Sequence, residues 1–235
     1  MTDLTDPTRS LVRYTRYTPG PSPLSSSLTV AGDTVSARTD HGVAVGRFTR
    51  RLDDAEQARL AEAVAAAGGL GAVVQPAGTG TVERLIADGV DLALAPPADP
   101  PAAAADLVGV VRDLDRSLAS HPVAGLRLAV RPAVDDADGH ALLEHIGTEA
   151  VLVRLGTLAL EATAYDADHA VVDSLEATVD VGIDGPVEPG WSVRLADLPI
   201  AVPDGGYVVV SVGPTEVDVD GSGVVQATHL AWTTP

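Results

Sequence analysis

Two histidines and a glutamate stand close together in the run His140-Ala141-Leu142-Leu143-Glu144-His145. Imidazole and carboxylate groups bind zinc in proteins, and helical zinc-binding histidines usually stand four residues apart on one face. Here the two histidines are five positions apart, which places them roughly 140° from each other around a helix. Glu144 can share a face with His140, but two ligands make a poor zinc site. The spacing therefore favours a solvent-exposed helix edge over a metal centre.

The run Gly78-Thr79-Gly80-Thr81-Val82-Glu83 has the start of a dinucleotide-binding turn between a predicted strand and a predicted helix. The complete pattern needs a third small residue where Glu83 stands, and a carboxylate at that place would repel a pyrophosphate. The run therefore favours an ordinary turn followed by the start of a helix.

The run Asp218-Val219-Asp220-Gly221-Ser222-Gly223 resembles the first half of a calcium-binding loop. Oxygen-bearing side chains fill positions one, three and five, and glycine fills position six. The bidentate acid expected at position twelve is replaced by His229, and no helix is predicted on either side. A hairpin turn is the favoured interpretation, so no metal or other cofactor is expected in this chain.

Two acidic clusters are candidate partner-binding sites. Asp135, Asp136 and Asp138 form the first cluster, in a loop-like stretch where we expect solvated carboxylates. The second is Glu216, Asp218 and Asp220, whose period of two places three carboxylates on one face of a strand. These acids either steer a basic partner or protect an exposed strand edge from pairing with other chains.

The composition excludes several classes of function. The 235 residues include no Lys, Cys or Asn, so Schiff-base chemistry, thiol nucleophiles, disulfides and thiolate metal sites are absent. The formal net charge of −18 disfavours binding to nucleic acid and suits a basic protein partner. No apolar run is long enough to span a membrane, and the acidic N-terminus predicts a cytoplasmic protein. The scarcity of residues with AT-rich codons is typical of a high-GC bacterial genome.

The apolar pattern predicts an α+β fold with two domains. Residues 1–135 are expected to form a β-meander with helices, and residues 136–235 a mostly antiparallel β-sandwich. The first helix, over 52–68, has a capping box of Asp53 and Glu56 and an apolar stripe of Leu60, Val64 and Ala67. Further helical segments are predicted over 81–88, from Asp99 to about 120, and over 141–146. Strands are predicted over 11–17, 28–30, 34–38, 43–48, 71–75, 90–95, 123–131, 151–155, 158–165, 175–183, 191–195, 207–212 and 224–232.

The C-terminal part carries a resemblance to a known family. The strand runs at 173–181 and 191–195 lead to the turn Pro203-Asp204-Gly205-Gly206-Tyr207, and the last strand contains Trp232. Over 158–232 the chain resembles the β-sandwich of competence-J-type nuclease inhibitors and related bacterial immunity-like proteins. The resemblance implies a stoichiometric inhibitor that binds a toxin or a secreted nuclease.

The main hypothesis is a non-enzymatic, acidic cytoplasmic protein that masks a basic toxin or nuclease. A first alternative is a small hydrolase or nucleotide-binding enzyme, for which Asp136, Asp138, His140 and Glu144 would have to converge on one pocket. A second is a structural assembly component whose sheet edges pair with copies of itself.

Overall fold

The computed structural model describes residues 10–18, 24–39, 44–75, 80–131, 139–200, 204–212, 217–219, 224–225 and 229–233. These residues form mostly strands, with two α-helices and one short 3-10 helix, so the predicted α+β class is confirmed. Contacts divide the chain into a first unit, Met1–Thr39 with Arg47–Pro122, and a second unit, Asp40–Gly46 with Val123–Pro235. The second unit thus includes the described residues 123–131, which lie within the predicted first domain. In the described part of the chain, no helix has both the length and the apolar character needed to cross a membrane.

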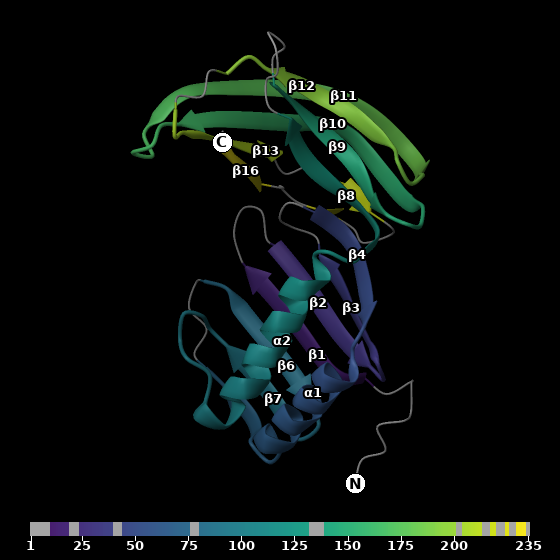
Figure 1. The fold of residues 1–235 in the computed structure, drawn as a ribbon, viewed down its shortest axis with the longest axis vertical. Coiled ribbons are helices and arrows are strands. Elements are labelled where there is room, and N and C mark those ends of the chain that lie inside the picture. The colour runs from purple at the N-terminus through teal and green to yellow at the C-terminus, as the bar shows by residue number, and fades with distance from the viewer. Residues whose placement is uncertain are drawn as a thin grey trace. The chain divides into compact units, whose positions relative to one another are not determined.

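The first unit is a sheet with its helices on one face (Figure 1). Its strands follow the order β4-β3-β2-β1-β6-β7-β5, with β5 parallel to β7 and the β1–β2, β2–β3, β1–β6 and β6–β7 pairs antiparallel. The strands are β1 (Ser10–Thr18), β2 (Leu24–Ala31), β3 (Thr34–Thr39), β4 (Ala44–Arg51), β5 (Gly71–Val74), β6 (Val82–Ala87) and β7 (Val90–Leu94). The predicted meander corresponds to β2, β3 and β4, which lie next to one another in the sheet, so it is present.

Helix α1 (Asp54–Ala67) begins at the capping box that the sequence predicts. The Asp53 carboxylate accepts a hydrogen bond from the backbone N–H of Glu56 at 2.8 Å, and the Glu56 carboxylate accepts one from the backbone N–H of Asp53 at 3.1 Å. Both bonds satisfy donors that the first turn of a helix leaves free. Arg50 donates two hydrogen bonds of 2.7 Å to the same Glu56 carboxylate, and these bonds connect the end of β4 to the helix.

Helix α2 (Ala105–Leu118) follows the 3-10 helix η1 (Ala102–Ala104). Its predicted apolar face is confirmed, because every member of that face is buried: Leu107, Val110, Val111, Leu114 and Leu118. The predicted start of this helix at Asp99 is wrong. The helix begins after Ala104 with no side-chain cap, because the 3-10 helix provides its first turn.

Two predicted helical segments are strands. Within the predicted helix at 81–88, Val82–Ala87 form β6, which pairs with β1 on one side and with β7 on the other. Residues 141–146 lie within β9 (Gly139–Gly147), between β8 (Pro122–Arg131) and β12 (Ser192–Leu198). Short apolar runs fit either state, and here neighbouring strands on both sides supply the hydrogen bonds that decide it.

The second unit contains two sets of strands. In the first, β12, β9 and β8 lie in that order, with the start of β4 beside β8. At Gly46 (φ 136°) a Cβ would collide with the carbonyl oxygen of Ala124, so this approach of β4 to β8 requires glycine. The second set is β10 (Val151–Tyr165), β11 (Val171–Val187), β13 (Tyr207–Val212), β14 (Val217–Val219), β15 (Val224–Val225) and β16 (His229–Thr233).

Strand β10 is the centre of the second set. Along one edge it pairs with β11, and along the other with β13 and β14, all antiparallel. Figure 1 shows β10 and β11 as a long curved pair. The side chains of β10 alternate strictly between a buried and an exposed face, apart from a bulge next to Gly156. Its buried side chains share one hydrophobic core with those of β8, β9, β12 and β13.

Candidate functional site

Most of the acids that the sequence analysis named as partner-binding lie outside the described residues. This is true of Asp135, Asp136 and Asp138, and of Glu216 and Asp220. Asp218 belongs to β14, where it stands opposite Arg154 of β10 on one side and Val224 of β15 on the other. Strand β14 has a paired strand on each side, so Asp218 does not lie on an exposed sheet edge and does not protect one from pairing.

The other candidate motifs have structural roles where the structure describes them. The turn at 78–80 lies partly outside the described residues, and β6 follows it in place of a helix. The predicted helix start is therefore wrong, and no helix N-terminus is available there to bind a phosphate. The calcium-like run lies largely outside the described residues, and its flanking strands β14 and β15 pair antiparallel, as the predicted hairpin requires.

The histidines at 140 and 145 lie on opposite faces of β9, because five positions is an odd number in a strand. His145 is buried, and its Nε2 lies 2.9 Å from the backbone oxygen of Glu149. Glu144 is bound by Arg127 and Arg131 of β8 at 2.9 and 2.8 Å. Within the described ranges, no three His, Asp or Glu side chains are grouped so that they could hold a metal ion.

Glu83 is buried, and it connects the sheet of the first unit to α2. Its carboxylate lies 2.6 Å from Arg112 Nη2, and its side chain is 5% exposed. The buried Tyr14 hydrogen-bonds to the same carboxylate. Burial, followed by the charge of Glu83, raises the pKa of the Tyr14 hydroxyl well above its ordinary value. This cluster is enclosed between β1, β6 and α2, which indicates a structural role.

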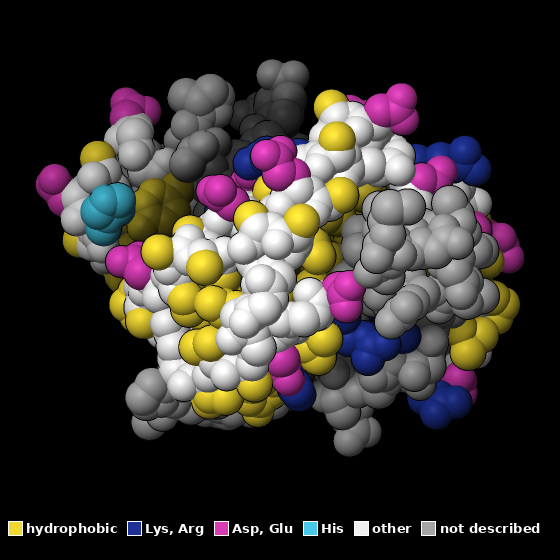
Figure 2. Space-filling view, turned by 90° about the horizontal axis from the view of Figure 1, so that it is seen from below, with side chains coloured by type: hydrophobic (Ala, Val, Ile, Leu, Met, Phe, Trp, Pro, Cys, Tyr) yellow, Lys and Arg dark blue, Asp and Glu magenta, His cyan; other side chains and the backbone are white. Residues whose placement is uncertain are grey.

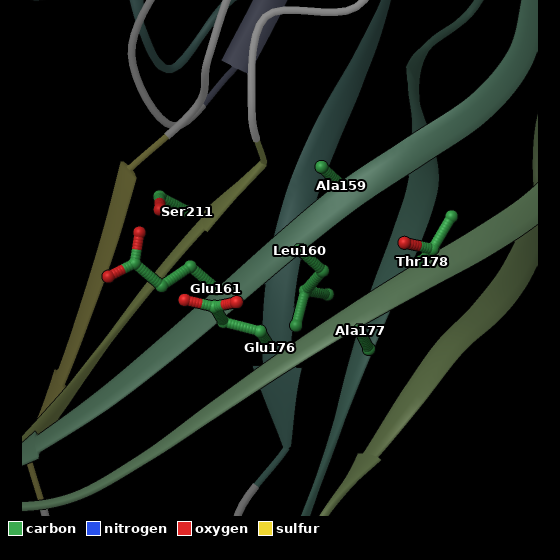
Figure 3. Close-up of a pocket in the computed structure, with 7 residues that line it drawn as sticks. All are labelled: Ala159, Leu160, Glu161, Glu176, Ala177, Thr178 and Ser211. Atoms are coloured by element: carbon green, nitrogen blue, oxygen red, sulfur yellow. The ribbon is translucent and has the colours of Figure 1, made fainter.

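The exposed face of β10, β11 and β13 brings acidic side chains together. Glu176 of β11 stands directly opposite Glu161 of β10, and Glu161 stands opposite Ser211 of β13. These three residues line an open hollow of about 360 Å³, together with Ala159, Leu160, Ala177 and Thr178. Figure 3 shows the side chains that line it. We call this surface, defined by Glu161, Glu176, Asp180 and Asp184, the acidic face.

Cations neutralise little of the acidic face. Glu161, Glu176 and Asp180 are exposed, and none of them forms an ion pair with a described residue. Asp184 alone lies near a cation, 3.4 Å from Arg154, and both side chains are largely exposed. The backbone register places Asp218 beside the same arginine. By contrast, on the face in Figure 2 acidic side chains are scattered among basic and apolar ones.

Aromatic and apolar side chains lie at one end of the β10–β11 pair. Tyr165 and Tyr207 are opposite each other and stack with ring centroids 5.0 Å apart. His169 Nδ1 lies 3.2 Å from the Tyr207 hydroxyl. Val171 and Val172 are exposed at the start of β11. Tyrosine is enriched among the residues that dominate binding energy at protein interfaces, so this end suits a contact with another protein.

The sequence contains a signal for the acidic face. From 174 to 184 the even positions are Ser, Glu, Thr, Asp, Gly and Asp, while the odd positions are Leu, Ala, Val, Val and Ile. This alternation predicts a strand with one acidic face and one apolar face. The strand is predicted over 175–183, but its acids are not among the predicted site residues. The pairing of Glu161 with Glu176 depends on a strand register that no local pattern reveals.

Comparisons with known proteins give no assignment: no protein-family model matches the chain, no curated protein matches it, and no solved structure matches it. The resemblance to competence-J-type nuclease inhibitors therefore stays a prediction.

Proposed function

We propose that this chain is a non-enzymatic, acidic cytoplasmic protein that binds and masks a basic protein partner. The observation that carries the proposal is the acidic face. There Glu161, Glu176 and Asp180 are exposed and form no ion pair with any described residue, in a chain of net charge −18. Such carboxylates create a negative potential that attracts basic proteins and speeds their association.

The partner class that we propose is a toxin or a nuclease, as the resemblance of residues 158–232 implies. We also infer that the second unit is an antiparallel β-sandwich. In support, side chains of its two sets of strands share one core that includes Leu126, Leu143, Leu160, Leu195 and Val210. Immunity-type binding needs a rigid surface, and such a core would hold the acidic face rigid.

Affinity capture from the source organism at low ionic strength, followed by identification and kinetics with the purified partner, tests the proposal. We expect a basic toxin or nuclease whose association rate falls as salt rises, because salt screens steering charges. A variant with Glu161→Gln, Glu176→Gln and Asp180→Asn should lower that rate about tenfold or more. A matched variant, Glu62→Gln with Asp99→Asn and Asp106→Asn, removes three exposed acids of the first unit and should leave the rate nearly unchanged.

One further variant and two possible outcomes bear on the proposal. The change Glu216→Gln with Asp218→Asn and Asp220→Asn measures whether the cluster around β14 also steers the partner. Failure to retain any basic protein at low salt would contradict the proposed function. So would an association rate that none of these variants alters.

A further inference from the structure

One edge of strand β11, which we call the free edge, pairs with no other strand that the structure describes. The strand has 17 residues, and among the described strands it pairs with β10 alone. No backbone hydrogen bond joins its other edge to any residue that the structure describes. A free edge presents a row of N–H and C=O groups on which another extended chain can form a ladder.

The apolar side of β11 is incompletely covered. Leu175, Val179, Val181 and Ile183 point to the core but remain partly exposed. Their neighbours on β10, among them Leu158 and Leu160, are each only 2% exposed. An added strand with apolar side chains on the same side would cover this surface.

The outward side of β11 carries acids at a fixed interval. Glu176, Asp180 and Asp184 are four positions apart, which is about 13 Å along a strand. Cross-strand pairs of opposite charge stabilise a ladder, whereas like charges oppose it. A neighbouring strand with cations at every fourth residue would match these acids in charge and in spacing.

We propose that the free edge of β11 binds an extended segment of a basic protein by strand addition, with Arg or Lys at every fourth residue and apolar residues between. This inference rests on the proposed function and specifies where and how the partner binds. A second copy of this chain is a poorer occupant. Antiparallel pairing of two β11 strands about a two-fold axis puts the same three carboxylates of each copy on one face.

A synthetic peptide of about twelve residues, with Val at alternate positions and Arg at every fourth residue, is a direct probe of the full-length chain. Fluorescence anisotropy at low ionic strength measures its affinity. Two further peptides carry N-methyl groups on either the odd or the even backbone nitrogens. Because a strand points successive N–H groups to opposite sides, only one of these two peptides should lose binding, by about tenfold or more.

Variants of the chain test the charge match. Glu176→Gln with Asp180→Asn should weaken binding of the unmodified peptide about tenfold, because it removes two acids that have no ion-pair partner among the described residues. Glu62→Gln with Asp106→Asn removes two exposed acids of the first unit and should leave the affinity unchanged. Hydrogen exchange of the β11 amides should slow when the peptide binds.

Several results would overturn the inference. These are equal affinity for both methylated peptides, no binding of the unmodified peptide, and a dimer of the free chain that Val179→Lys dissociates. A captured basic partner that leaves exchange of the β11 amides unchanged would also overturn it, while the proposed function would stand. Peptide binding at β11 without any basic partner in the source organism would instead overturn the proposed function.

Discussion

Glu161 and Glu176 lie directly opposite each other on β10 and β11, and no described residue forms an ion pair with either carboxylate. Like charges at directly opposed positions of a ladder destabilise it. The side chains on the buried faces of the same two strands are apolar, so core packing holds the two carboxylates together despite their repulsion. If the acidic face binds a basic partner as proposed, stability and binding place opposite demands on this pair.

Replacement of both glutamates by glutamine should stabilise the chain. We expect Glu161→Gln with Glu176→Gln to raise the free energy of unfolding by about 0.2–1 kcal/mol, since the repulsion disappears. Urea denaturation of the double variant and both single variants at low and high salt measures this gain. The gain should shrink as salt rises, because both groups are exposed. A double variant less stable than the original chain would contradict the prediction.

The buried ion pair of the first unit, Arg112 with Glu83, predicts a large loss of stability when its cation is substituted. Arg112→Ala leaves the Glu83 carboxylate buried without its cation, and should lower the free energy of unfolding by roughly 2–4 kcal/mol. Arg84→Ala is the matched control. It breaks the exposed Arg84–Asp91 pair, whose two side chains are 56% and 41% exposed, and should lower the free energy of unfolding far less, because water screens an exposed pair. Equal losses in the two variants would contradict a special role for Glu83.

The raised pKa of Tyr14 predicts that the chain loses stability at alkaline pH. Burial and the nearby Glu83 raise the pKa of Tyr14 in the folded chain above its value in the unfolded chain. The folded state then holds a proton that the unfolded state releases, so stability is complete below about pH 10 and falls as the pH rises above it. Denaturation at a series of pH values should show this fall, and Tyr14→Phe should reduce it. A fall of the same size in Tyr14→Phe would assign it to other groups.

The lowered pKa of Glu56 predicts that the free energy of unfolding falls at acid pH. The hydrogen bonds from Arg50 lower the pKa of Glu56 in the folded chain. Its contribution is therefore present above the ordinary pKa of about 4.3 and disappears as the pH falls through the lower, folded value. Glu56→Gln keeps a capping side chain at the same helix position, but should lose about 1 kcal/mol at neutral pH and show a weaker acid dependence. Denaturation of the variant and of the original chain at pH 7 and pH 3 measures how much stability each loses on acidification. An equal loss in both chains would refute the prediction.

Local sequence determined the elements whose hydrogen bonds close within a few residues. Asp53 and Glu56 cap α1 because they stand three positions apart, and the apolar stripe of α2 follows from its spacing alone. The alternation at 174–184 likewise determined that β11 has one acidic and one apolar face. These features depend on neighbours in the chain, so the sequence contains the information needed to predict them.

Only the tertiary structure decided the elements and contacts that depend on distant strands. Residues 82–87 and 139–147 became strands because β1, β7, β8 and β12 supply hydrogen-bonding partners on both sides. Glu83 became part of a buried ion pair because α2 brings Arg112 to it. The register that sets Glu161 against Glu176 arises from the packing of many apolar side chains, since a shift of one residue would turn each of them away from the core.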